Sequence, residues 1–302
     1  VTGVQTCALP IYLQTQGQHP APPRRNGKPF RLRQKESCAP RSAPGFNDHF
    51  VRICICLRNA FSSEMKITVL GAGAWGTALA RLLQQNKNDV TLWGHHAETL
   101  AEIQRTGRNE RYLPRIDLPR ELKFDPNLER AAAGRELIVI AVPSKAFRTI
   151  TGHHGDFRGN FVSVTKGIEF DTGLTMSGIL RQTMPAARIA ALSGPSLALE
   201  VARGIPTAIV AASAHADLAQ TLQKIFHQPT FRVYSSTDLI GVEMGGALKN
   251  VIAIAAGVGD GMGFGDNSKA SLVTRAIVEI RRLGVACGAH PDTFAEIGRA
   301  HV

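Results

Sequence analysis

The chain has 302 residues, 44% of them hydrophobic, which is enough for one large or two ordinary domains with a real core. Its net charge of +11 is uneven, because residues 1–64 hold nine Lys/Arg against three Asp/Glu. Four of the five cysteines lie in the same segment. Cys287 is thus the one cysteine after residue 64, and a single thiol cannot form a disulfide scaffold. This predicts a cytoplasmic protein. No run of 18 or more apolar residues occurs, so we expect no integral membrane segment.

Both ends of the chain differ from its body. Residues 1–64 show no sustained hydrophobic period, and a strand pattern begins directly after Met65. The peptides TCALPI (6–11) and EIGRAHV (296–302) can be encoded by the two strands of one short DNA, which resembles a sequencing-library adapter. We therefore expect residues 1–64 to be a non-native or disordered leader and residues 296–302 to be an artefact. The basic leader then predicts no nucleic-acid partner.

From Met65 onward, short apolar runs alternate with helical patterns. Strands are expected at 66–70, 89–93, 136–144, 161–167, 188–196, 207–213 and 231–235, with helices at 77–85 and 97–105 among the segments between them. This alternation predicts an α/β fold, a Rossmann-like doubly wound parallel sheet over residues 65–239. Two long helical patterns at 241–261 and 268–288 then predict the start of an incomplete all-α domain over residues 240–295.

The first candidate site is the glycine motif GAGAWG. Gly71, Gly73 and Gly76 follow a predicted strand and open a predicted helix, the context that a dinucleotide-binding loop requires. Gly71 allows the tight turn, Gly73 lets a pyrophosphate approach the backbone, and Gly76 lets helix and strand pack closely. Ala74 and Trp75 are expected to line the same loop.

The second candidate is LWGHH, about twenty residues further along. An NAD-selective site places Asp or Glu here for the ribose hydroxyl, whereas this chain has Gly94, His95 and His96. Without a carboxylate to repel a 2′-phosphate, NADPH is expected to be accepted and slightly favoured over NADH. The alternative is that both histidines are simply solvated.

The third candidate combines TKGIE with SGPS. Lys166 follows one predicted strand and Gly194-Pro195-Ser196 follows the next, at the sheet edge where doubly wound folds bind ligands. Backbone amides, a hydroxyl and an ammonium group there suit a phosphate. The alternative is an ordinary solvated lysine in a loop.

The fourth candidate is Lys249, in the apolar run GGALKNVIAI. Reduction of a ketone needs a proton on oxygen, and desolvation together with a neighbouring cation lowers the pKa of a lysine toward the range of a proton donor. Lys166 is the expected neighbouring charge, and the amide of Asn250 is expected to orient the substrate or cofactor. The alternative is a core lysine whose ammonium group reaches the surface.

These motifs, together with NERYLP, AVPS and the long block RVYSSTDLIGVEMGGALKNVIAIAAGVGDGMGFGDNSKASLVTR, resemble bacterial NAD(P)-dependent glycerol-3-phosphate dehydrogenases from Met65 to about Phe294. The resemblance implies that NAD(P)H reduces dihydroxyacetone phosphate to sn-glycerol 3-phosphate, the precursor of glycerophospholipids. It implies Lys249 as catalytic acid/base and implies two further sets of contacts. The substrate contacts are Lys166, Gly194 and Ser196; the cofactor contacts are Ala74, Trp75, His95, Lys166 and Ala198. No metal site is predicted, and a homodimer is expected for the full-length protein.

The chain departs from this pattern after Phe294. The family continues with a Gly-Leu-Gly-Asp block and a Ser-Arg-Asn segment that complete the substrate pocket, whereas here EIGRAHV follows. We therefore expect the chain itself to bind dinucleotide without turning over substrate. Two other interpretations stay open: a 2-dehydropantoate reductase-like enzyme, and a dinucleotide-sensing module without catalysis.

Overall fold

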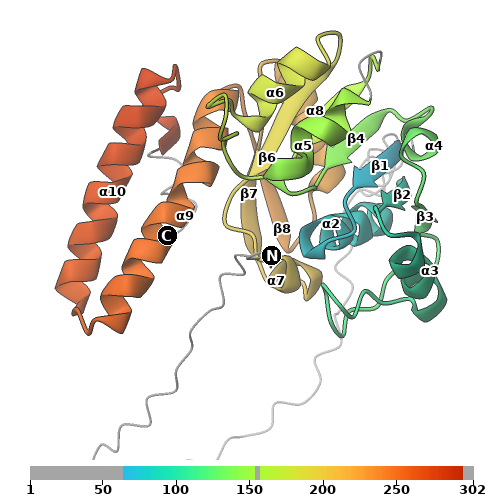
Figure 1. The fold of residues 1–302 in the computed structure, drawn as a ribbon, viewed down its shortest axis with the longest axis horizontal. Coiled ribbons are helices and arrows are strands. Elements are labelled where there is room, and N and C mark those ends of the chain that lie inside the picture. Colours follow the sequence, from blue (N-terminus) through green and yellow to red (C-terminus); the bar gives the residue numbers. More distant parts are fainter. Residues whose placement is uncertain (1–63, 154–156, 295–302) are drawn as a thin grey trace, which may run out of the picture. The chain divides into compact units, whose positions relative to one another are not determined.

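A computed structural model describes residues 64–153 and 157–294. The leader up to residue 63 and the tail from residue 295 lie outside the described residues, so the expectations about them are untested. Eight strands form one sheet in the order β3-β2-β1-β4-β5-β6-β7-β8 (Figure 1). The strands are β1 (Lys66–Leu70), β2 (Asp89–Trp93), β3 (Lys123–Asp125), β4 (Leu137–Ile140), β5 (Asn160–Ser163), β6 (Arg188–Ser193), β7 (Thr207–Ser213) and β8 (Phe231–Ser236).

Helices fill most of the connections between these strands. They are α2 (Ala74–Gln85), α3 (Ala97–Thr106), α4 (Leu128–Ala132), α5 (Ser144–Gly152), α6 (Met176–Thr183), α7 (Ala198–Ala202), α8 (Ala216–Phe226), α9 (Leu239–Gly261) and α10 (Asp266–Ala286). The order β1-α2-β2, with β4 on the other side of β1, places the first glycine loop at the point where strand order reverses. Ligands of doubly wound sheets bind at this point.

The predicted α/β sheet is confirmed, but it is not wholly parallel. All neighbouring pairs run parallel except β6 and β7, which pair antiparallel with Leu192 opposite Ala211. Strand periodicity reports burial and not direction, so the sequence pattern of residues 207–213 could not distinguish the two orientations. The link between these strands holds only the five-residue helix α7, which reverses the chain instead of crossing the sheet.

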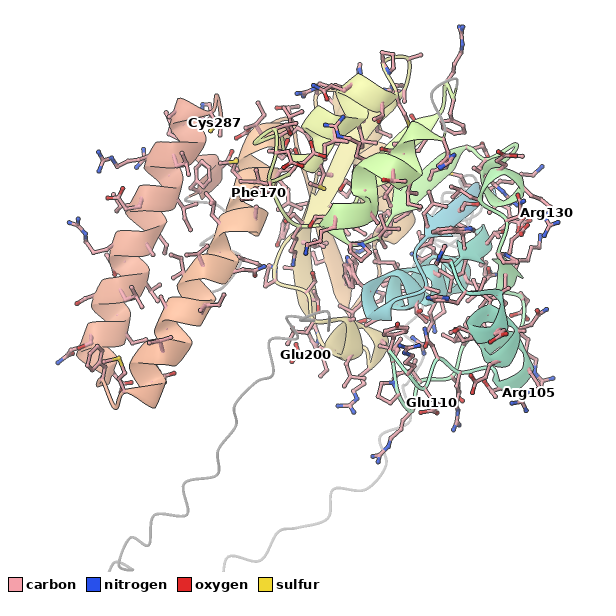
Figure 2. The ribbon with its side chains drawn as sticks, in the orientation of Figure 1. Arg105, Glu110, Arg130, Phe170, Glu200 and Cys287 are labelled. Carbon is pink, nitrogen blue, oxygen red and sulfur yellow. The ribbon has the colours of Figure 1, made fainter. Side chains whose placement is uncertain are left out.

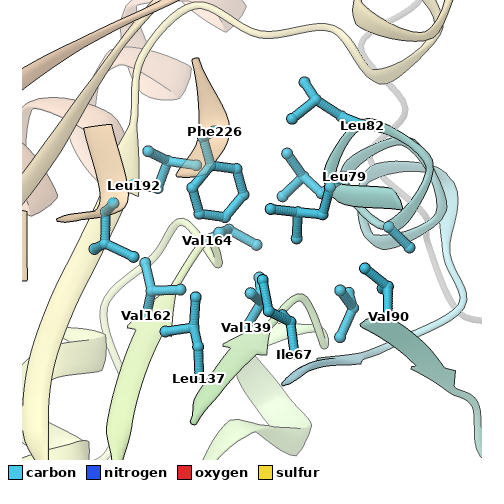
Figure 3. Packing of buried hydrophobic residues seen from close by; sticks show 14 of the residues in the cluster. Ile67, Leu79, Leu82, Val90, Leu137, Val139, Val162, Val164, Leu192 and Phe226 are labelled. Atoms are coloured by element: carbon cyan, nitrogen blue, oxygen red, sulfur yellow. The ribbon is translucent and has the colours of Figure 1, made fainter. Parts of the chain in front are cut away.

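Two apolar layers cover the two faces of the sheet. On one face, Leu79 of α2 and Phe226 of α8 pack against Ile67, Val139 and Val162 of the strands (Figure 3). A second buried cluster on the other face joins strand residues to α4, α5, α6 and the start of α9. Successive strand residues alternate between the two clusters, as the two-residue period of a strand requires. The core therefore fixes the sheet edge that carries the candidate site.

Helices α9 and α10 lie side by side as a hairpin (Figure 1). The first half of α9 is buried as far as Gly246, whereas its second half is largely exposed. Among the described residues, α9 alone is long and apolar enough to cross a membrane by length and composition, a test that a core helix also passes. The absence of an integral membrane segment stays a prediction, as do the domain bounds 65–239 and 240–295.

Candidate active site

The glycine loop after β1 is built by two close backbone contacts. Gly71 has φ of +122°, and a Cβ there would lie 2.5 Å from the carbonyl oxygen of Ala141. A Cβ on Gly76 would lie 1.9 Å from the carbonyl oxygen of Gly71, so helix and strand could not pack as they do. At Gly73 a Cβ would meet nothing within 4 Å. Protein packing thus requires the outer two glycines, whereas Gly73 leaves open space at the N-terminus of α2, as approach of a pyrophosphate needs.

A buried asparagine holds this loop in place. The side-chain amide of Asn109, 1% exposed, donates to the carbonyl oxygen of Ala72 at 3.0 Å and to Oγ1 of Thr77 at 2.8 Å. Sequence reasoning missed this residue, which occurs in the NERYLP motif. A single polar residue in a loop carries no periodic signal, so only its motif membership pointed to it.

The predicted cofactor residues beyond the glycines fall into two places. Ala74 is the first residue of α2, and Trp75 and Ala198 pack against one small apolar cluster that includes Leu113 and Ile116. His95 is exposed just after β2, and its ring centroid lies 5.0 Å from that of His96.

The loop that carries His95 abuts the glycine loop. A Cβ on Gly94 would lie 2.9 Å from Cβ of Ala72. A ligand on the glycine loop would therefore lie next to the segment that carries His95. The role of His95 toward a ribose phosphate stays a prediction.

The two predicted lysines meet at one atom. Nζ of Lys166, in the loop after β5, donates to the carbonyl oxygen of Gly194 at 3.0 Å. Nζ of Lys249, from the middle of α9, donates to the same oxygen at 3.1 Å. Gly194 follows β6 and lies against β7, because a Cβ there would come within 3.0 Å of Cα of Ile209. Three elements distant in sequence therefore bring two cations to one point of the sheet edge.

Burial lowers the pKa of both amines, and the charge of Lys249 acts further on Lys166. Desolvation lowers the pKa of Lys249. It also lowers the pKa of Lys166, and the positive charge of Lys249 adds to this, bringing the value to about 8. We expected the like charge to act on Lys249; instead it lowers the pKa of Lys166, the more buried of the two amines. The pair releases a proton far more readily than an isolated lysine would.

Of the other two predicted substrate residues, Ser196 contacts the carbonyl oxygen of Gly194 and Asn250 does not. Oγ of Ser196 is half-buried and donates to the carbonyl oxygen of Gly194 at 3.3 Å. A pocket beside it is lined by Ser193, Gly194 and Pro195 together with Lys249 and residues of α9 and β7. Asn250 is exposed and is not among the residues that line this pocket. The structure therefore groups Ser196 with the lysine pair but does not bring Asn250 there.

The loop that carries Lys166 is held by an ion pair. Arg148 of α5 donates to the two carboxylate oxygens of Glu169 at 2.8 and 2.6 Å, which lowers the pKa of Glu169 to about 2. The next residue, Phe170, is 99% exposed (Figure 2). The base of the loop is thus fixed while its tip is open to solvent.

Helix α9 packs closely against β6 where residue 246 is a glycine. A Cβ on Gly246 would lie 2.2 Å from Oγ of Ser193, so with a larger residue there the Ser193 hydroxyl, the helix or the strand would have to move. Lys249 follows one turn later and faces the same sheet edge. The described residues include no group of three His, Cys, Asp or Glu side chains that could hold a metal ion. The groups that the described structure gathers at this sheet edge are two perturbed amines, backbone amides and a dinucleotide-type loop.

Two family models match the sequence of this chain. Residues 66–219 match the N-terminal model of NAD-dependent glycerol-3-phosphate dehydrogenase, and residues 238–300 match its C-terminal model. Over 236 residues the chain is 47% identical to a glycerol-3-phosphate dehydrogenase [NAD(P)+] of Geobacter metallireducens, covering 76% of this chain and 70% of that protein. A Bacillus pumilus protein of the same name is 46% identical, with 76% and 68% covered.

A solved structure of the same family has a similar fold. A glycerol-3-phosphate dehydrogenase from Coxiella burnetii superposes with a TM-score of 0.73 at 36% sequence identity, covering 77% of this chain and 72% of that one. The Rossmann-like sheet followed by helices is therefore an architecture that this chain shares with a structure of substantial sequence similarity.

Proposed function

Because the chain belongs to the NAD-dependent glycerol-3-phosphate dehydrogenase family, we propose that it reversibly reduces dihydroxyacetone phosphate to sn-glycerol 3-phosphate. The observation that carries this proposal is the convergence of Lys166 and Lys249 on the carbonyl oxygen of Gly194. This point lies at the carboxyl edge of the same sheet that carries the glycine loop. The product would supply glycerophospholipid synthesis in the cytoplasm.

A phosphorylated three-carbon ketone suits the charges at this edge. Two ammonium groups within reach of one oxygen repel each other, and a phosphate dianion between them would relieve that repulsion. Lys166, Gly194 and Ser196 are the groups proposed to hold the substrate, with the backbone amides of residues 194–196 available as further donors. Binding of the anion would raise the pKa of both lysines and keep them protonated.

Lys249 is proposed as the acid that protonates the carbonyl oxygen. Its ammonium group approaches from α9, and burial lowers its pKa toward the working range of a proton donor. During reduction Nζ gives one proton to the developing alkoxide and becomes a neutral amine. In the reverse reaction the neutral amine removes that proton. Asn250 is exposed, and we propose that its side chain turns inward on binding and orients the substrate.

The residues around the glycine loop fit a dinucleotide. Open space at Gly73, the free amides at the start of α2 and the exposed His95 provide the pyrophosphate and ribose contacts that we propose, with Trp75 and Ala198 beside them. When bound, NADPH or NADH supplies the hydride that reaches the carbonyl carbon. We propose that NADPH is slightly favoured, since no carboxylate follows β2 within residues 94–96.

Steady-state NADPH oxidation tests the proposal. The assay compares dihydroxyacetone phosphate with glyceraldehyde 3-phosphate, ketopantoate and acetoacetyl-CoA. It uses both the chain and an extended chain, in which residues 65–294 continue with the C-terminal segment of the Geobacter metallireducens relative. In the extended chain we expect dihydroxyacetone phosphate to give the highest kcat/KM, whereas the chain itself should bind NADPH without turnover. A higher value for any of the other three substrates would overturn the assignment, and gel filtration of the same samples tests the proposed homodimer.

A further inference from the structure

Helix α9 contains a buried carboxylate that the reaction does not use. Glu243 is 8% exposed, and its two carboxylate oxygens accept hydrogen bonds from the backbone amide of Ser177 at 2.8 Å and from Oγ of Ser177 at 2.5 Å. Ser177 is the second residue of α6, so its amide is one of the N-terminal donors without a partner inside that helix. The carboxylate therefore joins α9 to the positive end of α6.

Stability alone does not account for a carboxylate at this position. Burial raises the pKa of Glu243, because the charged form loses its hydration, and no ion pair within 4 Å involving Glu243 is found among the described side chains. Replacing such a group by an apolar side chain of similar volume is often neutral or stabilising. What the carboxylate adds is direction, since two hydrogen bonds to one residue fix both the position and the rotation of α9.

Glu243 shares one face of α9 with the active-site lysine. Glu243, Gly246 and Lys249 follow one another at intervals of three residues, and residues three apart are neighbours on a helix surface. They contact, in that order, Ser177 of α6, Ser193 of β6 and the carbonyl oxygen of Gly194. The three contacts form a line along which α9 lies against the rest of the structure.

We propose that Glu243 is a positioning residue, which sets the rotation of α9 so that Nζ of Lys249 reaches the carbonyl oxygen of Gly194. This rests on the proposed function, in which Lys249 donates the proton. An atom about 6 Å from a helix axis moves by about 1 Å when the helix rotates by about 10°. A displacement of about 1 Å at a reacting group costs about a hundredfold in rate. A small loss of rotational control at Glu243 is therefore amplified at Lys249.

Two substitutions at residue 243 and one matched control, all made in the extended chain described above, test this role. In Glu243→Gln the amide oxygen still accepts from the Ser177 amide, so we expect kcat within about threefold of wild type. In Glu243→Ala both hydrogen bonds are lost, and kcat should fall about 10- to 100-fold. The dissociation constant for NADPH should stay within about twofold in both. Thr293→Val is the control, because Oγ1 of Thr293 donates to Asp238, the N-cap of the same helix, at 2.6 Å.

The control should lower the urea midpoint of unfolding without lowering kcat more than about twofold. Equal loss of kcat in Thr293→Val and Glu243→Ala would show that any loosening of α9 has this effect and would overturn the proposal. An unchanged kcat in Glu243→Ala would also overturn it. Ser177→Ala, which removes only the hydroxyl donor, is the milder test if Glu243→Ala does not fold. Its kcat should fall by a smaller factor, and an unchanged kcat there would contradict the proposed role.

A readout without substrate separates this proposal from the proposed function. Reductive ¹³C-methylation allows NMR titration of Lys166, whose pKa is lowered to about 8 partly by the nearby charge of Lys249. If α9 rotates in Glu243→Ala, that charge moves away and the pKa of Lys166 should rise, whereas Glu243→Gln should leave it in place. An unchanged titration in Glu243→Ala would overturn the positioning role even if the enzyme turns over its substrate. Failure of wild type to reduce dihydroxyacetone phosphate would overturn only the function.

Discussion

The carbonyl oxygen of Gly194 accepts from two lysines, and this shared contact governs the chemistry at the scale of single residues. Neither lysine pairs with a carboxylate in the described structure, and each is half-buried. Without an anion beside it, each amine loses its positive charge only by releasing a proton. A site that is strained by like charges without its ligand gains most from an anion. We therefore propose that the phosphate of the substrate is recognised by relief of repulsion as well as by direct hydrogen bonds.

The lowered pKa of Lys166 predicts how the free energy of unfolding depends on pH. The unfolded chain holds the Lys166 proton up to its ordinary pKa of 10.5, whereas the folded chain releases it near 8. Between these values the unfolded state binds more protons, so the free energy of unfolding of wild type should rise with pH relative to Lys166→Met. We expect a relative gain on the order of 1–3 kcal/mol.

Urea unfolding of the ligand-free protein at pH 7.5 and pH 10 measures this gain. Lys87→Met, at an exposed lysine in the turn after α2, is the control and should follow wild type at both values. If the difference between wild type and Lys166→Met is the same at both pH values, the amine does not titrate in this range.

His95 is predicted to determine the choice between the two nicotinamide dinucleotides. In His95→Asp a carboxylate would accept from the ribose 2′-hydroxyl of NADH and repel the 2′-phosphate of NADPH. The ratio of kcat/KM for NADPH to that for NADH should therefore fall at least about tenfold. His96→Asp is the matched control, since His96 is the N-cap of α3. A shift in His96→Asp and not in His95→Asp would assign the ribose contact to His96.

At the scale of elements, Gly246 determines how closely α9 approaches β6. In the Gly246→Ala variant of the extended chain, the new methyl group would meet Oγ of Ser193 at about the 2.2 Å found for an ideal Cβ, so the buried hydroxyl, the helix or the strand must move. We expect a loss of about 1–3 kcal/mol in the free energy of unfolding, as for other overpacked sites. We also expect kcat to fall at least about tenfold, because Lys249 moves with the helix.

Gly257→Ala on the same helix is the control for this substitution. A Cβ at residue 257 meets nothing within 4 Å, so alanine should stabilise α9 by about 0.5–1 kcal/mol through helix propensity alone. Urea unfolding and steady-state rates of both variants measure the two effects. Equal stability and kcat in Gly246→Ala and wild type would show that the contact with Ser193 relaxes without consequence.

The elements of the sheet were predictable because each has a periodic apolar signature. The runs at 66–70, 89–93 and 207–213 coincide with β1, β2 and β7, whose buried residues fill the two core clusters. The antiparallel direction of β7 was not predictable, since it depends on the short link through α7 and not on the pattern within the strand. The three-residue strand β3 is too short to show any period.

The candidate site was predictable only in part, for a related reason. Motifs located Lys166, Gly194 and Lys249 individually, and the rule that ligands bind at carboxyl edges predicted that they are close. Their common acceptor could not be inferred, because it depends on how far α9 lies from β6. Glu243 was not predicted. It lies three residues before Gly246 and six before Lys249, and a single acidic residue at this spacing in an apolar helix could have indicated its role.

At the scale of the whole molecule, the second half of α9 exposes an apolar stripe. Val251, Ile254, Val258 and Met262 recur at helical spacing, and the first two are 61% and 63% exposed. The adjoining helix α10 adds exposed apolar residues and ends near Cys287, an exposed free thiol (Figure 2). Contiguous apolar surface of this kind favours association.

We therefore predict that the 302-residue chain binds the dye ANS and self-associates at micromolar concentration. The triple substitution of Val251, Ile254 and Val258 by Gln should reduce both, because it removes the centre of the stripe. Ile205→Gln, at an isolated exposed isoleucine, is the control and should change neither. Analytical ultracentrifugation measures the association. A monodisperse monomer without ANS binding would contradict the prediction.

The proposed activity requires Lys249 as the proton donor, and replacing this residue tests that requirement. Lys249→Met keeps the length and apolarity of the side chain but removes the proton donor. The substitution is made in the extended chain, with Lys87→Met as control. Turnover of dihydroxyacetone phosphate with NADPH should fall by at least about a hundredfold, the range that general acid catalysis contributes. NADPH affinity measured by fluorescence should stay within about twofold. A Lys249→Met enzyme that retains a tenth or more of the wild-type kcat would contradict the account.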